Sequence, residues 1–409
     1  MLNERNEREL CYLVVIDSIE PIEGKDKVEC ARVGGWTIMV RKGQFNPGDV
    51  GVYFEIDSKV PEKEPFDFLA QKHYKIKTQR YRAGEGHFYS QGLLMHPSDF
   101  GWDVATEPVG GVRTDVVIDS DGKAHYVDDE SRFLTKELGV VYAVAEDNKR
   151  KARSVDKYTK MAQRHRELFA RAPYKWLISR DWGKKLLFVF YGKKRDTRGW
   201  PSHICAKTDV ERIQNMMWVL EDKHPYVASE KVDGSSCTIA AERTRFGKIR
   251  YYVCSRNVVF DDEDAKCFYD SNIYFEVYHK YNLKEKITQM LDDCHLDNIA
   301  LQMEVYGEGV QKRTYSTKEH KAAVFHIVTN REKFPMEETV RLCEKYDIPH
   351  VPIIDTDYVF PDDLDELREY VEGAPSKIDE KEKEGIVFYD KTGQIYTKFV
   401  SPNYLMKYH

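Results

Sequence analysis

Short apolar runs alternate with Gly, Pro and Asp breakers over the first hundred residues. The stretches CYLVVIDSI, VECARVGGWTIMVRKG and DVGVYFEIDS have the β-branched and aromatic content of strands. Pro47-Gly48-Asp49 is a turn signal between two of them. A further β-rich stretch, YKIKTQRYRAGEGHFYSQGLLM, is also basic and aromatic. Several short strands in about 100 residues predict a small barrel over 1–102, with the OB type as one candidate and a small β-sandwich as the alternative.

The pattern is weaker over 103–200. VGGVRTDVVIDSDGKAHYV predicts a hairpin around Asp121-Gly122. KYTKMAQRHRELFARA predicts a basic helix that ends at Pro173. We expect 103–200 to be a linker or inserted region that is basic toward its end.

Residues 201–409 alternate between strand-like and helix-like patterns. TDVERIQNMMWVLED predicts a helix capped by Thr208 or Asp209. A β-rich block over 226–259 follows it, and then a helical stretch, NIYFEVYHKYNLKEKITQMLDDC. IALQMEVYGEGV, AAVFHIVTN, EGIVFYD and QIYTKFVS predict strands, and MEETVRLCEKYDI and DDLDELREYVEG predict helices. This order predicts an α+β domain of antiparallel sheets with flanking helices.

Charge and composition narrow the class of protein. The 63 basic and 69 acidic residues give a net charge of -6, which argues against a purely electrostatic nucleic-acid binder. The segment from Lys149 to Arg198 is nevertheless basic and is compatible with a local phosphate-binding surface, the alternative being a solvated helix face. No apolar run of about 18 residues and no signal sequence is visible, so we expect a cytoplasmic protein without membrane contact. The eight cysteines show no zinc-binding spacing.

One lysine stands where chemistry is expected. In YVASEKVDGSSCTIAAE, Lys231 lies between an apolar strand pattern and an Asp-Gly turn, which places one amine at a fixed point. A lysine with a pKa of about 10.4 is a cation at neutral pH, and making it a nucleophile requires lowering that value by roughly three units. Burial or a nearby cation can do this, and Mg²⁺ beside the α-phosphate of ATP would also polarise the phosphate.

The segment around Lys231 resembles the lysine motif of the covalent nucleotidyltransferase superfamily of polynucleotide ligases and capping enzymes. Five further segments resemble motifs of that superfamily in the same order: CSRN at 254–257, LQMEVYGEG at 301–309, VFHIV at 324–328, KEGIVFY at 383–389 and IYTKFVSPNYL at 395–405. The ordered set extends from about 208 to the carboxyl end.

The resemblance implies a role for each matched side chain. Lys231 would be the nucleophile. Asp233 and Glu384 offer the hard oxygen ligands that suit Mg²⁺, or Mn²⁺ in its place. The residues implied in nucleotide binding are Glu230, Arg212 and Arg256 near the phosphates or substrate, Glu304 at the ribose, Phe325 stacked on the purine, and Lys398 at a phosphate. The sequence departs from the superfamily pattern at Tyr389, Tyr396 and His326.

The amino-terminal segment adds a closer resemblance. PIEGKDKVECARVGGWTIMVRKGQFNPGDVGVYFEIDS is similar to the OB domain that precedes the catalytic domain in the RNA ligase 5 family, and SQGLLM and AKTDVERIQN are similar to that family as well. DNA ligases usually carry their OB domain after the catalytic domain. The resemblance therefore implies an ATP-dependent RNA ligase that joins 3′-OH and 5′-phosphate RNA ends, nicked duplexes included, without an obligate protein partner.

Three alternatives stay open at this point. A DNA ligase and a capping guanylyltransferase would use the same lysine chemistry. A non-catalytic nucleic-acid-binding homologue is disfavoured, because a degenerate copy should have lost some of Lys231, Asp233, Glu304, Glu384 and Lys398.

Overall fold

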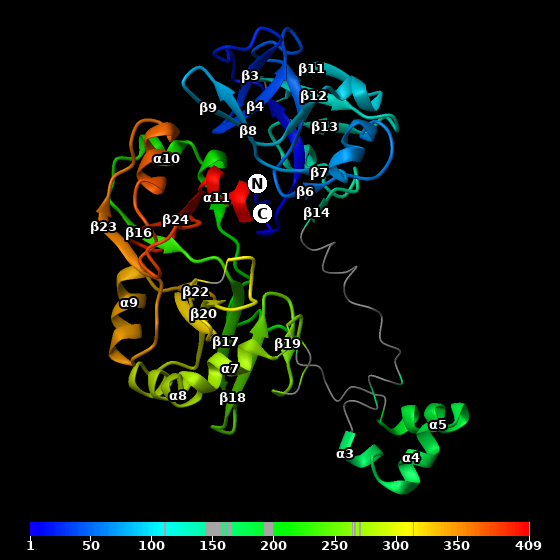
Figure 1. Ribbon diagram of the computed structural model, residues 1–409, viewed down its shortest axis with the longest axis vertical. Helices are drawn as coiled ribbons and strands as arrows, with labels where there is room; N and C mark the ends of the chain where they lie inside the picture. The colour runs from blue at the N-terminus through cyan, green and yellow to red at the C-terminus, as the bar shows by residue number, and fades with distance from the viewer. Residues whose placement is uncertain are drawn as a thin grey trace. The chain divides into compact units, whose positions relative to one another are not determined.

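The structure is a computed structural model that describes 1–109, 112–143, 158, 161, 166–191, 199–263, 265, 267–269, 271–313 and 315–408 (Figure 1). The chain forms two compact units, one of Met1–Ala143 with Trp200–His409 and one of Val144–Gly199. Among the described residues, no helix is both long and apolar enough to cross a membrane.

Short antiparallel strands build the amino-terminal part of the first unit. One sheet has the order β1 (Cys11–Val15), β5 (Val50–Phe54) and β10 (Leu93–Met95). A second has the order β2 (Ser18–Pro21), β3 (Val28–Val33) and β4 (Trp36–Arg41). The remaining pairings join β14 (Val141–Tyr142), β6 (Ser58–Lys59) and β7 (Lys75–Ile76), and separately β8 (Gln79–Ala83) and β9 (Gly86–Ser90).

Strand β1 is apolar throughout because both of its faces are buried. Tyr12 and Val14 pack into one cluster with Trp36, whereas Cys11 and Leu13 pack into another on the opposite face. Alternate side chains of a strand point to opposite faces, so a continuous apolar run is what a strand between two cores requires.

The predicted inserted region 103–200 is divided by the structure. β11 (Asp103–Val109), β12 (Val112–Ile118) and β13 (Ala124–Tyr126) form an antiparallel sheet within the first unit. Val117 of β12 packs in the same core as Leu13 of β1, so this segment extends the amino-terminal domain. The predicted hairpin is confirmed, since Ile118 pairs with Ala124 around a turn that contains Asp121-Gly122.

In the part of the second unit that the structure describes, α3 (Arg166–Phe169), α4 (Ala172–Ile178) and α5 (Asp181–Tyr191) are helical. The predicted end of a helix at Pro173 is wrong, because Pro173 lies in the first turn of α4. Proline is tolerated there, since the first turn has no intrahelical use for its missing N–H. Much of the basic segment 149–198, including 149–157 and 192–198, lies outside the described residues.

Two sheets and six helices form the carboxy-terminal part. One sheet has five strands in the order β15 (Glu211–Arg212), β25 (Tyr396–Val400), β24 (Gly385–Asp390), β16 (Tyr226–Lys231) and β23 (Ile353–Tyr358). The other has six in the order β19 (Val259–Phe260), β18 (Ile249–Ser255), β17 (Ser235–Arg243), β20 (Asn298–Tyr306), β21 (Lys321–Thr329) and β22 (Glu332–Lys333). All pairings are antiparallel except that of β15 with β25.

Helices cover these sheets, as Figure 1 shows. They are α6 (Trp218–Glu221), α7 (Ile273–Lys280), α8 (Leu283–Asp293), α9 (Met336–Lys345), α10 (Leu364–Glu372) and α11 (Pro402–Tyr408). Val277 of α7 and Ile287 of α8 pack in one core with Leu301 of β20. The expected α+β class is therefore confirmed: a small β domain comes first in the chain, and antiparallel sheets with flanking helices follow it.

The predicted helix over 208–222 is wrong for most of its length. Residues Glu211–Arg212 form β15, which pairs in parallel with β25, and Ile213–Asn215 form a 3₁₀ turn. Only α6 at the end of the stretch is α-helical. Pairing with a strand almost 190 positions later overrides the local helix preference.

Candidate active site

Lys231 is the last residue of β16 and lies opposite Gly385, the first residue of β24. Its amine donates to Oε2 of Glu384 over 2.6 Å. The lysine side chain is one-quarter exposed, while that of Glu384 is buried. Two adjacent strand ends thus place an accessible amine against a fixed carboxylate.

The turn after Lys231 carries the chain from the five-stranded sheet into the six-stranded one. Gly234 lies in this turn, and a Cβ added there would come within 2.3 Å of the carbonyl oxygen of Val305 and 2.9 Å of Cγ of Glu304. Only glycine fits this approach. The glycine therefore brings Glu304, on β20, against the turn that holds the lysine.

Asp233 is held by two tyrosines. Its backbone N–H donates to the Tyr315 hydroxyl over 2.6 Å, and its Oδ2 accepts from the Tyr404 hydroxyl over 2.7 Å. The aspartate is buried. Its carboxylate is therefore fixed close to Lys231. The hydrogen bond from Tyr404 uses Oδ2 of this carboxylate and not Oδ1.

The carboxylates around Lys231 decide its charge. Burial, the strongest single influence, lowers the pKa of the Lys231 amine, but the negative charges of Glu384 and Glu304 raise it, and the net pKa is above the ordinary value. Removal from water raises the pKa of half-buried Glu304 to about 8. The amine is therefore a cation surrounded by carboxylates. The carboxylates of Asp233 and Glu384 offer the hard oxygen atoms that suit a divalent cation.

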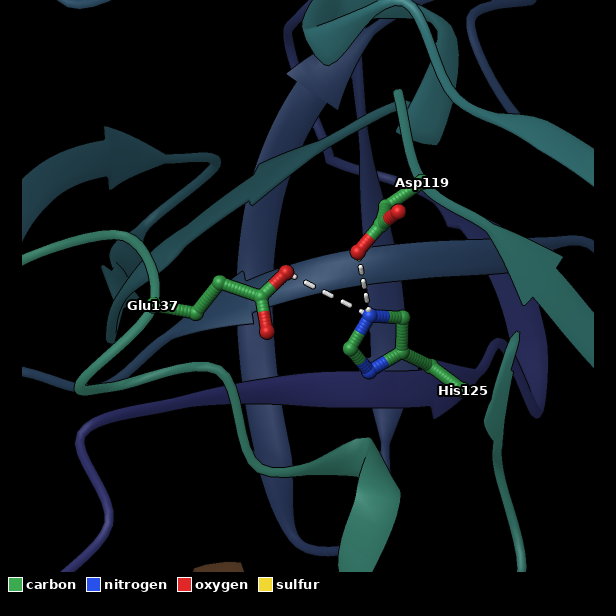
Figure 2. Close-up of side chains that lie close together, drawn as sticks. All are labelled: Asp119, His125 and Glu137. Carbon is green, nitrogen blue, oxygen red and sulfur yellow. Dashed lines mark hydrogen bonds and ion pairs between the residues drawn. The ribbon is translucent and has the colours of Figure 1, made fainter. Parts of the chain in front are cut away.

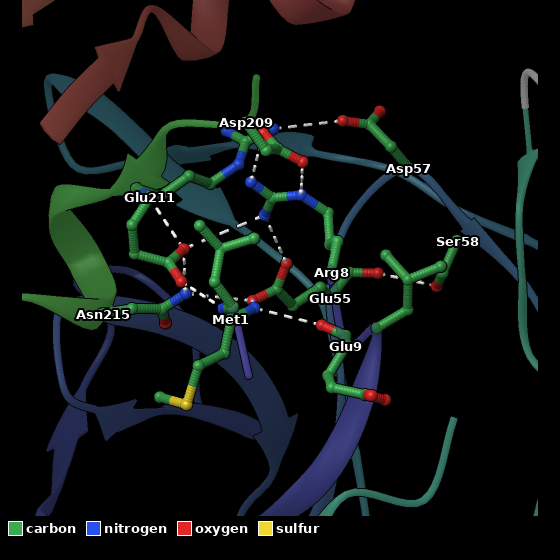
Figure 3. Close-up of polar contacts among 12 residues, drawn as sticks. Met1, Arg8, Glu9, Glu55, Asp57, Ser58, Asp209, Glu211 and Asn215 are labelled. Carbon is green, nitrogen blue, oxygen red and sulfur yellow. Dashed lines mark hydrogen bonds and ion pairs between the residues drawn. The ribbon is translucent and has the colours of Figure 1, made fainter. Parts of the chain in front are cut away.

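A second cluster gathers cations around Asp209, and Figure 3 shows the contact of Asp209 with one of them, Arg8. Arg8, from the amino-terminal segment, donates to both Asp209 oxygens over 3.1 and 3.0 Å. Arg256 lies 3.0 Å and Lys398 3.5 Å from the same carboxylate. These cations hold the pKa of Asp209 well below its usual range despite its burial. The sequence interpretation of Asp209 as a helix cap is therefore wrong, since its carboxylate serves this cluster.

Lys398 has an unusual charge state for a lysine. Burial, together with the positive charge of Arg8, lowers its pKa to about 7, against the opposing effect of Asp209. It lies opposite Arg212 in the pairing of β15 with β25. An anion near these strand ends would restore its charge.

Arg212 joins the two domains of the first unit. Its Nη2 donates to Oδ2 of Asp57 over 3.1 Å, and its Nη1 is buried without a hydrogen-bond partner among the described residues. The ring of Trp36, on β4, lies 5.8 Å from the guanidinium. A buried donor without a partner is costly, so this nitrogen is available to a ligand oxygen.

Phe325 and Glu230 lie in different surroundings. Between β20 and β21 the register shifts at Phe325, leaving it as an extra residue between buried Val324 and His326. Such a bulge re-aims a side chain, and Phe325 packs half-buried against the cluster that contains Val232. The carboxylate of Glu230 instead accepts from the Ser376 hydroxyl and the Lys377 N–H over 2.5 and 2.7 Å, which fixes that loop.

Arg8 and Asp57 were not expected from the sequence. The charged start MLNERNEREL was visible, but no local signal pairs Arg8 with a residue 201 positions later. Tertiary folding alone brings these groups beside Arg212 and Lys398.

A separate cluster of three side chains, Asp119, His125 and Glu137, lies in the amino-terminal domain (Figure 2). His125 is fully buried, with Nε2 3.0 Å from Asp119 and 3.3 Å from Glu137, and its Nδ1 donates to the carbonyl of Ser131 over 2.8 Å. Both ring nitrogens of His125 therefore lie within hydrogen-bond distance of oxygen atoms. The hydrogen bond from His125 holds the pKa of Asp119 below its usual range. This group stabilises the added sheet.

Comparisons with solved structures place the whole chain in one known fold. Naegleria gruberi RNA ligase aligns with 98% of this chain and 99% of its own. A complex with ATP and Mn of a glutamate-to-alanine variant has 22% identity and a TM-score of 0.68, and a complex with PPi has 23% identity and a TM-score of 0.67. At this identity the likeness establishes the fold. No curated protein matches the sequence.

Family models match both domains. An OB-fold domain model matches residues 10–96, and an RNA ligase model matches residues 224–409. The second match contains Lys231 and every motif segment after it. The chain thus carries an OB-fold domain ahead of an RNA ligase domain.

Proposed function

We propose that this RNA ligase uses ATP and forms a covalent lysyl-AMP intermediate at Lys231. The amine attacks the α-phosphorus of ATP, a phosphorus–nitrogen bond forms, and pyrophosphate leaves. The AMP group then passes to the 5′-phosphate of an RNA end, which frees the lysine. A 3′-OH attacks that activated phosphate, the strand is joined, and AMP departs.

The carboxylate surround of Lys231 is the observation that carries the proposal. One acid is enough to pair with a structural lysine. Three carboxylates raise the pKa of the Lys231 amine, and part of its side chain stays exposed. Mg²⁺, or Mn²⁺ in its place, held through Asp233 and Glu384 would neutralise these charges and polarise the α-phosphate. Glu384, 2.6 Å away, is the nearest acceptor for the proton that the amine must lose.

The cations around Asp209 support a binding site for the triphosphate of ATP. Lys398, Arg256 and Arg212 would take phosphate oxygens in exchange for their contacts with Asp209 and Asp57. Phe325 would stack on the purine, Glu304 would bond the ribose, and Glu230 would act by shaping the loop next to the nucleotide. A Naegleria gruberi RNA ligase complex contains ATP and Mn, which supports this choice of cofactors.

We also propose RNA ends that carry a 3′-OH and a 5′-phosphate as substrates, including the nicked duplex. Neither a protein partner nor a membrane is needed for this chemistry, and we expect the reaction to take place in the cytoplasm.

Self-labelling tests the proposal. Protein incubated with α-labelled ATP and Mg²⁺ should become covalently labelled, Lys231→Ala should not, and the matched surface variant Lys248→Ala should label as wild type. Label from GTP instead of ATP would indicate a capping guanylyltransferase, and no label from either would indicate a non-catalytic homologue. Equal sealing of ribose and deoxyribose 3′-OH ends would point to a DNA ligase.

A further inference from the structure

Three side chains with metal-binding atoms lie together in the amino-terminal domain (Figure 2). Among the described residues, Asp119, His125 and Glu137 are the only such group, with their ligand atoms within 4.8 Å of one another. They come from three segments: Asp119 follows β12, His125 lies on β13, and Glu137 lies in the loop before β14. None of the three belongs to the candidate ligase site or to the cluster around Asp209.

The ring of His125 turns one nitrogen toward two carboxylates. Nδ1 lies 2.8 Å from the carbonyl oxygen of Ser131, which can only accept a hydrogen bond, so Nδ1 carries a proton. In a neutral ring Nε2 is then an acceptor. The oxygens beside it, Oδ2 of Asp119 at 3.0 Å and Oε1 of Glu137 at 3.3 Å, are acceptors as well. This nitrogen belongs to a fully buried side chain, so a positive charge is required between the three atoms.

A proton on Nε2 accounts for one of the two carboxylates. An N–H bond points in a single direction and makes one well-aligned hydrogen bond. The second carboxylate would be held beside the first without a donor from the ring, although like charges at close range repel. A divalent metal ion bonds all three atoms at once. Ligand atoms about 2.0–2.1 Å from such an ion lie roughly 3.0–3.3 Å from one another, in agreement with both distances from Nε2.

The neighbouring groups hold the three side chains in the orientation that an ion needs. The hydrogen bond from Nδ1 to Ser131 sets the ring of His125, and metal-bound histidines usually make such a bond. Oδ1 of Asp119 accepts from two backbone N–H groups of the following turn, over 2.9 Å each, which leaves Oδ2 toward the ring. The amine of Lys123 lies 2.9 Å from the other oxygen of Glu137, Oε2. The three facing atoms are thus positioned by contacts outside the cluster.

The types of ligand atom select the class of ion. An imidazole nitrogen suits Zn²⁺ and other first-row transition ions, whereas Mg²⁺ and Ca²⁺ prefer sites made of oxygen atoms alone. We propose that Asp119, His125 and Glu137 bind one divalent transition-metal ion, for which Zn²⁺ fits best, with water in the position that the protein leaves open.

An ion in this position would join the added sheet to the core of the amino-terminal domain. Asp119 and His125 belong to the hairpin of β12 and β13, whereas Glu137 follows a segment that is bonded to β1. In that segment the N–H of Leu134 donates to the carbonyl of Cys11 over 2.9 Å. The ion therefore has a structural role, separate from that of the Mg²⁺ proposed for the ligase reaction.

Zinc binding can be measured without ligase activity. Chelator-treated protein is titrated with Zn²⁺ against a chromophoric chelator, in an excess of Mg²⁺ that fills sites made of oxygen atoms alone. Glu137→Gln removes one charged ligand from the partly exposed side of the cluster. Glu85→Gln, in the exposed turn between β8 and β9, is the matched control. Asp233→Asn reports on any ion bound at the ligase site.

Wild type, Glu85→Gln and Asp233→Asn should each bind one Zn²⁺ per chain, and Glu137→Gln should bind it at least about tenfold more weakly. Zn²⁺ should raise the Tm of wild type by more than that of Glu137→Gln, because an ion that binds the folded state stabilises it. Nitrogen-15 NMR of the histidine rings should show that Nε2 of His125 carries no proton once Zn²⁺ is bound. This last measurement uses wild type, so it decides the matter even if Glu137→Gln fails to fold.

The proposal is overturned if wild type binds no Zn²⁺ in excess Mg²⁺, or if Glu137→Gln and Glu85→Gln bind it equally well. Protons on both ring nitrogens of His125 in the presence of Zn²⁺ would also overturn it, since the positive charge would then be that of a histidinium ion. Loss of Zn²⁺ binding in Asp233→Asn would place the ion at the ligase site instead.

Discussion

Lys231 and Glu384 face each other across the ends of two neighbouring antiparallel strands, with the amine 2.6 Å from the carboxylate. This contact keeps the lysine protonated while no nucleotide is bound, because the pKa of the amine is raised by Glu384 and its acidic neighbours against the effect of burial. The proposed nucleophile is thus held as a cation. Reaction requires that the surrounding negative charge be neutralised.

Gly234→Ala should abolish most of the activity without unfolding the protein. The added Cβ would lie 2.3 Å from the carbonyl of Val305, so the turn must move away from β20 and carry Lys231 with it. Because a displacement of about 1 Å can cost about 10²-fold in rate, we expect self-labelling to fall by at least that factor. Gly199→Ala, where nothing lies within 4 Å and the backbone is not in the left-handed region, is the matched control for an added methyl group. Near-normal labelling of Gly234→Ala would show that this close approach is dispensable.

The OB domain should act in the first chemical step. Arg8 pairs with Asp209, and Asp57 pairs with Arg212, so both OB-side residues set the position of groups proposed to contact phosphates. We expect Arg8→Ala and Asp57→Asn to raise KM for ATP in self-labelling by about tenfold, since they disturb charge pairs that are partly buried. The exposed control Arg5→Ala should have no effect. If only RNA sealing and not self-labelling responds, the OB domain serves RNA binding alone.

Lys398 should take up a proton when a triphosphate binds. Its pKa of about 7 leaves it mostly neutral at pH 8, and nearby phosphate charge should raise that pKa above 8. The measurement is calorimetric titration with an ATP analogue that has a non-cleavable α–β bridge, in buffers of different ionisation enthalpy. It should show that each binding event takes up just under one proton. Lys398→Met should lose this uptake, whereas Lys248→Met should keep it. Equal uptake in Lys398→Met would assign the proton to another group.

Glu304 should make stability depend on pH. Its folded-state pKa of about 8 is above the unfolded value of about 4.3, so the folded protein holds a proton that the unfolded chain releases between these values. The free energy of unfolding from this group therefore falls as pH rises from about 4.3 to 8. Glu304→Gln removes this fall, so its stability relative to wild type should increase by about 1 kcal/mol or more between pH 6 and 9 in urea unfolding. A constant difference across that range would contradict the raised pKa.

Much of the candidate site was predictable from short local segments. The strand pattern and the Asp-Gly turn single out Lys231, whereas Asp233 and Glu384 follow from the resemblance of their segments to superfamily motifs, and the structure brings all three together. Glu304 reaches them through the close approach at Gly234, which an Asp-Gly pair makes possible.

The parts that were missed depend on contacts between distant segments. Glu211 and Arg212 have the local sequence of a helix and form a strand only because β25 supplies a partner. The contact of Arg8 with Asp209 and that of Asp57 with Arg212 join two domains, and no periodic pattern reports such pairs. The sheet formed by 103–126 was taken for part of an inserted region because its apolar face is visible only once Val117 packs in the core of the OB domain.

The most direct measurement is mass spectrometry of peptides from the protein after incubation with ATP and Mg²⁺ in the absence of RNA. We predict one modified peptide, containing Lys231 with AMP on its amine, and no modified peptide from Lys231→Ala. Transfer of that AMP to added 5′-phosphorylated RNA should then restore the unmodified peptide. AMP found on another residue, or retained by the protein after Lys231→Ala, would contradict the assignment of this lysine as the nucleophile.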